Sequence, residues 1–132
     1  MSRHATTDQD AADRERHARA RLLAGGGDSL PRPPWLATGQ PPADIDLARH
    51  LLWRCNTRPH DVAPEDGQAG LSLLSAVRSE VDQIEAALLF TARAEGMTWA
   101  QVAEGLGLRT GQAAQQRCER VLSRLHDGTE QL

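Results

Sequence analysis

The chain has 132 residues, of which 39% are apolar, 25% are charged and 3% are aromatic, and its formal net charge is −3. This length fits one domain of ordinary size with some slack, and the few aromatic residues disfavour a large sheet core. No apolar run reaches the roughly 20 residues that cross a bilayer, and the N-terminus lacks a signal-peptide core, so we expect neither a transmembrane nor a classically secreted protein but a cytoplasmic one.

The charge is unevenly distributed along the chain. All fifteen basic residues are Arg. Residues 42–96 contain five Arg and nine acidic residues, whereas residues 109–125 contain four Arg and one acidic residue. The net charge therefore argues against a uniformly basic nucleic-acid coat but leaves one basic segment of helix length. Cys55 and Cys118 are expected to be reduced thiols in a chain of this class.

Residues 1–43 are predicted to form a flexible arm and linker. An Arg-rich helix over 11–24 has only a weak apolar stripe, and Gly25 to Gly27 would end it. The following segment, 31–42, is rich in proline and favours extended backbone, with Trp35 and Leu36 as candidates to dock on the folded part. The arm is interpreted either as a solvated leader or as a basic segment that follows the DNA backbone or minor groove.

A helical domain is predicted over residues 44–126, followed by a short tail at 127–132. Its first helix begins near Asp44, which is expected to act as the N-cap, and runs to about Arg54 with a buried face of Ile45, Ala48, Leu51 and Leu52. A loop over 56–67 leads to a long helix at 69–94, which Gly96 ends. The predicted core stripe of that helix consists of Leu74, Val77, Val81, Ile84, Leu88 and Ala92. No segment alternates with a period of two, so the predicted fold class is all-α.

Residues 98–125 have the pattern of a helix-turn-helix. Thr98 and Gln101 form a capping-box signature for a short helix whose buried side is Trp99, Val102, Ala103 and Leu106. Gly107 follows at a position that needs a positive φ. A second helix begins near Thr110 and has Ala114, Cys118, Val121 and Leu125 as its core stripe. The small Ala103 is expected to let this second helix cross the first one closely.

The polar side of the second helix has the chemistry for reading DNA. Gln can bond adenine at two atoms and Arg can bond guanine or phosphate, and the N–H groups at a helix N-terminus can bind phosphate oxygens. The predicted DNA-binding residues are Arg109, Thr110, Gln112, Gln115, Gln116, Arg117, Arg120 and Arg124. We expect the glutamines to read bases and the arginines to attach to the backbone.

This segment resembles the helix-turn-helix of region four of bacterial sigma factors. It is closer still to short actinobacterial DNA-binding proteins, some of them labelled transcriptional regulators of a small heat-shock protein. The resemblance covers about residues 79–125 and is carried by four motifs: Ile84-Glu85-Ala86-Ala87, Thr98-Trp99-Ala100-Gln101-Val102-Ala103, Leu106-Gly107-Leu108 and Gln112-Ala113-Ala114-Gln115-Gln116-Arg117. It implies DNA contact for Gln112, Gln115, Gln116 and Arg117.

Two residues depart from the pattern of those proteins. Cys118 stands where they tend to carry an aromatic residue, which is expected to loosen the core. Gly111 lies in the first turn of the second helix and costs up to about 1 kcal/mol relative to Ala, so this turn is expected to be frayed until DNA binds.

Other classes of function have weaker support in the sequence. His50, Cys55 and His60 match no compact spacing of zinc ligands, and no metal or cofactor is expected. No nucleophile elbow, phosphate-binding glycine loop or framed carboxylate pair is present, so no enzyme is predicted. We predict a transcriptional regulator that binds double-stranded DNA, with homodimerisation expected through the helix at 44–54 or the long helix. The alternative is a protein-interaction module that binds a sigma factor or RNA polymerase.

Overall fold

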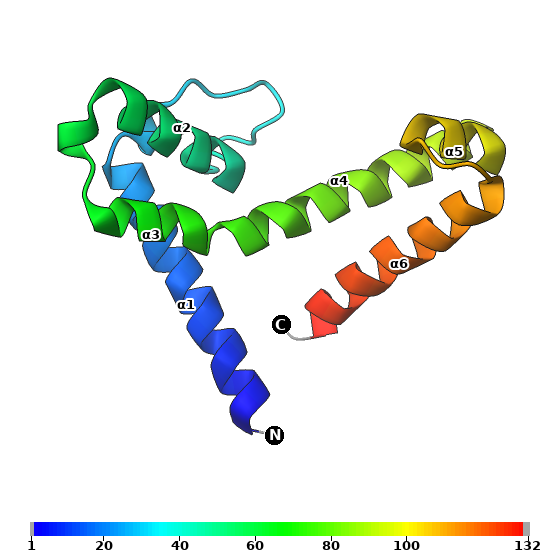
Figure 1. The fold of residues 1–132 in the computed structure, drawn as a ribbon, viewed down its shortest axis with the longest axis horizontal. Helices are drawn as coiled ribbons and strands as arrows, with labels where there is room; N and C mark the ends of the chain where they lie inside the picture. The colour runs from blue at the N-terminus through cyan, green and yellow to red at the C-terminus, as the bar shows by residue number, and fades with distance from the viewer. Residues whose placement is uncertain (1, 131–132) are drawn as a thin grey trace. The chain divides into compact units, whose positions relative to one another are not determined.

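The computed structural model describes the backbone of residues 2–130 and the side chains of residues 7–127. Over this range the chain is all-α and contains no strand, which confirms the predicted fold class (Figure 1). None of the helices described is both long and apolar enough to cross a membrane. The α-helices are α1 (Ser2–Ala24), α2 (Asp44–Thr57), α3 (Pro64–Ser72), α4 (Leu74–Ala94), α5 (Trp99–Leu106) and α6 (Gly111–Glu130).

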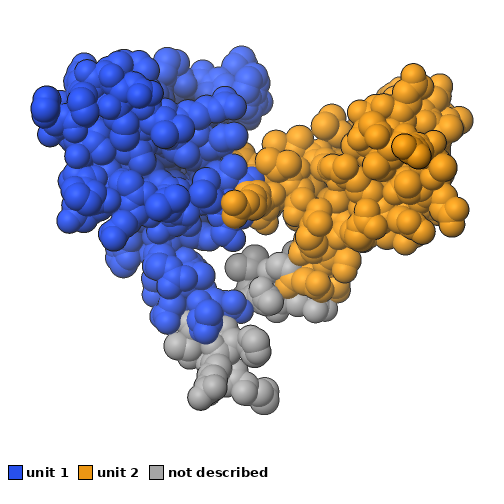
Figure 2. All heavy atoms as spheres, in the orientation of Figure 1, with its two compact units in different colours: residues 1–77 blue, residues 78–132 orange. Residues whose placement is uncertain are grey.

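The chain forms two compact units, Met1–Val77 and Arg78–Leu132 (Figure 2). The predicted division into an arm up to residue 43 and one domain over 44–126 is wrong, because α1 is part of the core of the first unit. The predicted tail is also shorter than expected. Helix α6 continues to Glu130, and residues 131–132 lie outside the described residues.

Helix α1 is packed rather than solvated along its C-terminal half. Ala18 and Leu22 are one turn apart and are 4% and 1% exposed. They lie in one apolar cluster with Leu47 and Leu51 of α2 and with Leu73. A weak stripe suffices here because two other helices bury it, and burying a leucine contributes about 1.5–3 kcal/mol.

The glycines after α1 are placed by a close approach of α2. Gly26 has a φ of 121°, which only glycine adopts without strain. A Cβ on Gly27 would lie 2.4 Å from Leu47 Cδ2 and 2.8 Å from the Leu22 carbonyl oxygen. The predicted end of the helix at this run is confirmed, and the contact with Leu47 adds a packing reason for glycine.

The proline-rich segment contains no helix, as predicted. Arg32 braces it by donating to the carbonyl oxygens of Gln40 and Ala37, each at 2.6 Å. Trp35 is 85% exposed, so the expectation that it docks on the folded part is wrong. Local hydrogen bonds hold the segment instead.

Helix α2 begins at Asp44 but uses this residue differently from the prediction. Ala43 occupies the N-cap position, and the Asp44 carboxylate accepts two hydrogen bonds from Arg19 of α1, at 2.7 and 3.0 Å. The buried side chains of α2 are Leu47 and Leu51, whereas Leu52, predicted to be buried, is 63% exposed. The buried face is therefore rotated toward Leu47, because α1 approaches from that side.

Asp66 joins three helices of the first unit. It is 6% exposed, and its carboxylate accepts from Arg21 of α1 at 2.7 Å and from the Ala63 N–H at 2.9 Å. Arg54 of α2 lies 3.6 Å away. Burial by itself would raise the pKa of Asp66, but these donors and charges outweigh it and hold the pKa below its ordinary value.

The region predicted as one helix over 69–94 contains two. The expected loop is correspondingly shorter, because α2 runs to Thr57 and α3 begins at Pro64, with a 3-10 turn between them. Helix α3 ends at Ser72 and α4 begins at Leu74, and the intervening Leu73 is fully buried in the core of the first unit. Burial of Leu73 against α1 and α2 thus fixes where the two helices are separated.

The predicted core stripe of α4 is wrong for its most apolar members. Val81 and Ile84 are each 53% exposed and Leu88 is 66% exposed, while the adjacent Leu89 is 5% exposed. Leu89 belongs to the core of the second unit together with Val102, Ala103 and Ala114 of α5 and α6. Periodicity alone selected the larger apolar face, but α5 and α6 pack on the other one. Helix α4 ends at Ala94, and Gly96, the residue predicted to end it, follows in the turn with a φ of 92°.

Candidate nucleic-acid interface

Helix α5 begins with the predicted capping box. Thr98 Oγ1 accepts from the Gln101 N–H at 3.1 Å, and Gln101 Oε1 accepts from the Thr98 N–H at 2.8 Å. These two bonds satisfy donors that the first turn of a helix otherwise leaves unpaired. The start of the first helix of the motif is therefore determined by neighbouring residues.

The turn between α5 and α6 has the predicted left-handed glycine. Gly107 has φ 70° and ψ 23° and accounts for the sharp end of α5. The Leu108 N–H donates a hydrogen bond to the Ala103 carbonyl oxygen at 2.8 Å and so caps the C-terminus of α5. The chain thus changes direction over the four residues 107–110 between α5 and α6, within the turn length of a helix-turn-helix.

Helix α6 starts in close contact with α5. The Ala113 N–H donates to Thr110 Oγ1 at 3.1 Å, so Thr110 caps the helix. A Cβ on Gly111 would lie 3.0 Å from Trp99 Cβ and 3.1 Å from the Ala100 backbone nitrogen. The prediction of a frayed first turn overlooked this contact, because glycine is what lets the start of α6 approach α5.

The inner side of α6 confirms the predicted stripe. Ala114 and Val121 are fully buried, and Cys118 and Leu125 are half-buried. Ala103 on α5 is 2% exposed and shares the core with Ala114. Two alanines at this crossing leave room for the helices to approach closely.

Five of the predicted DNA-binding residues lie on the outer side of α6 or just before its start. Gln112, Gln115 and Gln116 are exposed within the first two turns. Arg109 precedes the helix and Arg120 follows one turn later, both exposed and with no ion pair to the described side chains. This face, defined by Arg109, Gln112, Gln115, Gln116 and Arg120, is called the outer face below.

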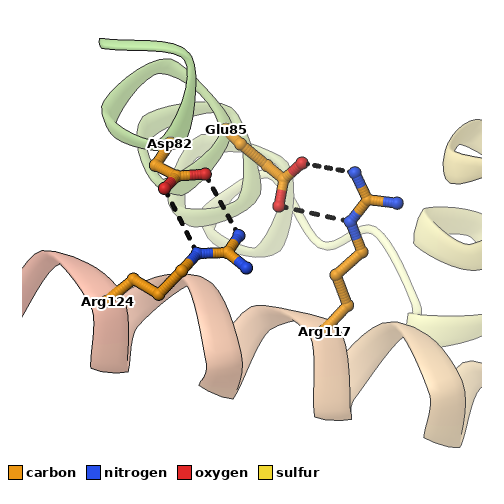
Figure 3. Close-up of polar contacts among 4 residues, drawn as sticks. All are labelled: Asp82, Glu85, Arg117 and Arg124. Atoms are coloured by element: carbon orange, nitrogen blue, oxygen red, sulfur yellow. Dashed lines mark hydrogen bonds and ion pairs between the residues drawn. The ribbon is translucent and has the colours of Figure 1, made fainter. Parts of the chain in front are cut away.

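Arg117 and Arg124 are directed at α4, as Figure 3 shows. Arg117 donates twice to Glu85, at 2.7 and 3.3 Å, and Arg124 donates twice to Asp82, at 3.1 and 3.2 Å. The Glu85 side chain is 16% exposed, and its carboxylate raises the pKa of Arg117. Two of the four arginines predicted to attach to DNA are thus neutralised within the chain.

Sequence reasoning missed Glu85 and Asp82 as partners of α6. A usable signal existed in the spacing of the charges. Asp82 and Glu85 are three residues apart and share one face of α4, and Arg117 and Arg124 are seven residues apart and share one face of α6. The acidic surplus of residues 42–96 is in part the complement of the basic surplus of residues 109–125.

A cation–π contact supports the turn between α4 and α5. The Arg93 guanidinium carbon lies 4.7 Å from the Trp99 ring centroid, and Arg93 Nη1 donates to the Met97 carbonyl oxygen at 2.7 Å. Trp99 is half-buried and packs against the core of the second unit, consistent with its predicted role on the buried side of α5.

The residues weighed as zinc ligands lie in the first unit. Cys55 is an exposed free thiol on α2, and no group of three or more His, Cys, Asp or Glu among the described residues is placed to hold a metal ion. His50 instead stacks on Trp53, with ring centroids 5.8 Å apart.

Comparison of the chain with known protein families, curated proteins and solved structures finds no match in any of the three.

Proposed function

We propose that this protein binds double-stranded DNA in a sequence-specific manner through the helix-turn-helix formed by α5 and α6, and that it acts as a transcriptional regulator. The observation that carries the proposal is the outer face. Three exposed glutamines stand within two turns of a capped helix start that follows a left-handed glycine turn. This is where helix-turn-helix proteins carry the side chains that contact base edges.

The chemistry of the outer face divides into reading and attachment. Gln112, Gln115 and Gln116 each offer a donor and an acceptor, which match the N6 and N7 atoms of adenine in the major groove. Arg109 and Arg120 lie at the two ends of this group and suit the flanking phosphates. Backbone N–H groups in the first turn of α6 add donors for a phosphate oxygen.

Arg117 and Arg124 are assigned a different role from the one the sequence predicted. Their paired carboxylates hold α6 against α4 and so orient the outer face. A guanidinium that already donates twice to a carboxylate gains less from a phosphate, because it must first give up those bonds. Attachment then depends on Arg109 and Arg120, so we expect a modest electrostatic contribution.

A protein-interaction module that binds a sigma factor or RNA polymerase is the second candidate. The observation that favours it is the neutralisation of Arg117 and Arg124 within the chain. Only two arginines remain on the outer face, and the exposed Glu119 beside them reduces the net positive charge there further. The two candidates differ in salt dependence, because binding to DNA releases counterions in proportion to the phosphates contacted.

Selection from a random duplex library followed by fluorescence anisotropy tests the proposal. The full chain should enrich a defined sequence, and Gln116→Ala should bind it about 10-fold or more weakly, since one lost bidentate base contact is worth about 1–3 kcal/mol. Gln83→Ala makes the same chemical change at an exposed position of α4 and should leave affinity unchanged. No enrichment, or equal effects of the two substitutions, would overturn the proposal.

A further inference from the structure

The first unit contains a cavity between α2 and the proline-rich segment that runs beside it (Figure 1). Its volume is about 840 Å³, within the range of roughly 300–1,000 Å³ that is typical of small-molecule sites. Prolines and aromatic rings make up most of the lining, with a few polar groups among them. The lining consists of residues 29–35 and Pro42 on one side, Asp46, Arg49, His50 and Trp53 of α2 on the other, and Gly26.

Two tryptophans of this lining are left open to solvent. Trp35 is 85% exposed and Trp53 is 52% exposed. Neither belongs to the apolar cluster that forms the core of the first unit. An indole covers 150–250 Å² when it is buried, so two exposed indoles on one cavity forgo a large stabilisation. Exposed apolar surface gathered in a concave site is typical of a ligand-binding surface.

The chain itself holds both sides of the cavity in place. On α2, His50 stacks on Trp53 with an angle of 22° between the rings, and the backbone of Gly26 lies so close that a Cβ there would be 3.0 Å from His50 Cε1. On the other side, Arg32 donates to two carbonyl oxygens of its own segment, and the Ala37 N–H donates to Gln40 Oε1 at 3.0 Å. A site that is held in this way loses little conformational entropy when a ligand binds.

The charges of the lining favour an anionic ligand. Arg49 is exposed and forms no ion pair with any side chain that the structure describes. The one acid of the lining, Asp46, lies in the first turn of α2, where the helix dipole stabilises a carboxylate. Burial and Arg54 lower the pKa of His50, so its imidazole is uncharged at neutral pH. Two arginines therefore face one carboxylate.

We propose that this cavity binds a small planar aromatic acid, whose ring stacks on the indoles and whose carboxylate pairs with Arg49. Stacking on an aromatic ring contributes more than the burial of the same apolar area, which favours a planar ring over a saturated one. The guanidinium of Arg49 can donate two hydrogen bonds to one carboxylate. Because only this guanidinium is free and Asp46 is nearby, the site suits a single negative charge. The inference does not rest on DNA binding.

NMR of the full chain, with naphthoate as the probe, tests the proposal. Each tryptophan has one indole N–H signal, which substitution of that tryptophan by Phe assigns. Naphthoate should shift the signals of Trp35 and Trp53 in a saturable way, with a Kd on the order of 1 mM or below. The signal of Trp99, which belongs to the second unit, should stay in place. If the Trp35 and Trp53 signals do not move at several millimolar naphthoate, the proposal is wrong.

Two related probes separate the charge from the ring. Naphthamide has the same ring without the negative charge, and decahydronaphthoate has the same charge on a saturated ring. Both should bind about 5-fold or more weakly than naphthoate. Equal affinity of naphthamide would overturn the role of the charge, and equal affinity of decahydronaphthoate would overturn the role of aromatic stacking.

Substitutions in the lining locate the site. Arg49→Gln should weaken naphthoate binding by about 5-fold or more and leave naphthamide binding unchanged, whereas Arg14→Gln, at an exposed position of α1 outside the cavity, should affect neither. Trp35→Ala should weaken binding by about 10-fold, and Leu71→Ala, at a side chain 70% exposed and outside the lining, should not. Equal effects within either pair of variants would place the probe elsewhere and contradict the assignment.

Discussion

Arg117 and Glu85 are joined by two parallel hydrogen bonds across the α4–α6 contact, with the carboxylate largely shielded from water (Figure 3). Arg117 lies next to the three glutamines of the outer face but is directed away from it. The pair therefore links the position of α6, the proposed DNA-reading helix, to α4. It gives Arg117 a structural role that does not involve DNA.

The first prediction concerns the stability that this pair contributes. In a double-mutant cycle of Arg117→Ala and Glu85→Ala, we expect a coupling of about 1 kcal/mol, since the pair is bidentate but the arginine side chain is 39% exposed. Urea unfolding followed by Trp99 fluorescence, in a background that carries Trp35→Phe and Trp53→Phe, measures this coupling energy. Arg120→Ala, at an exposed position with no described ion-pair partner, should change stability by less than about 0.5 kcal/mol.

The second prediction concerns the salt dependence of DNA binding. With Arg109 and Arg120 as the phosphate contacts, log Kobs should fall against log salt with a slope of about −2. Arg120→Ala should reduce the magnitude of that slope by about 1, whereas Arg124→Ala, whose guanidinium is held by Asp82, should leave it nearly unchanged. Equal slopes for the two variants would contradict the division of the arginines proposed above.

The third prediction compares two helical glycines. Gly111→Ala should destabilise the second unit by about 1 kcal/mol, because the new methyl group meets backbone atoms and the Cβ of α5 and the helix must shift. Gly105→Ala lies in α5 with open space around it and should stabilise the unit by up to about 1 kcal/mol. Thermal unfolding of the two variants should therefore move Tm in opposite directions.

The fourth prediction tests whether α1 belongs to the folded core. Leu22→Ala should destabilise the first unit by about 2–5 kcal/mol, as expected for a leucine that is 1% exposed. Leu52→Ala makes the same change at a side chain that is 63% exposed and should cost much less. The fluorescence of Trp53 reports on this unit when the other tryptophans are replaced. If the two substitutions had equally small effects on stability, α1 would be a solvated arm and not part of the core.

The fifth prediction is a loss of stability of the first unit in acid. Burial and the nearby Arg54 lower the pKa of His50 from its ordinary value of 6.5, and the pKa of Asp66 is lowered from 3.8. In both cases the unfolded state binds the proton more readily, so the stabilisation is complete above the ordinary pKa and is lost as pH falls through the lower folded pKa.

Unfolding measured over a pH series checks this sign. Stability should decline below about pH 6.5 through His50 and fall further below about pH 4 through Asp66. Asp66→Asn should have lower stability at neutral pH and a flatter profile below pH 4. A stability that rises as the solution is acidified would be inconsistent with both shifts.

The features that the sequence predicted well depend on residues close together in the chain. The bonds between Thr98 and Gln101 span three residues, and the left-handed turn at Gly107 depends on that residue alone. The stripe of α6 was also predicted correctly, because its buried and exposed sides differ clearly in composition. These local features define the predicted helix-turn-helix pattern.

Tertiary structure decided the features that depend on where other helices approach. Helix α4 has apolar residues on two sides, and only the packing of α5 and α6 determines that Leu89 is buried while Leu88 is exposed. Likewise, the sequence of α1 considered alone has only a weak apolar stripe. Ala18 and Leu22 are buried because α2 and Leu73, which lie more than twenty residues further along the chain, pack against them.

By itself, then, the sequence determined the all-α class and the polar character of the outer face. It also determined the capping box at Thr98 and the left-handed turn at Gly107, because hydrogen bonding and backbone sterics act over a few residues. Only the tertiary structure decided that Arg117 and Arg124 are paired with Glu85 and Asp82 while Arg109 and Arg120 are not. Ion pairs between helices depend on the geometry of packing, which is set by the burial of apolar surface contributed from distant parts of the chain.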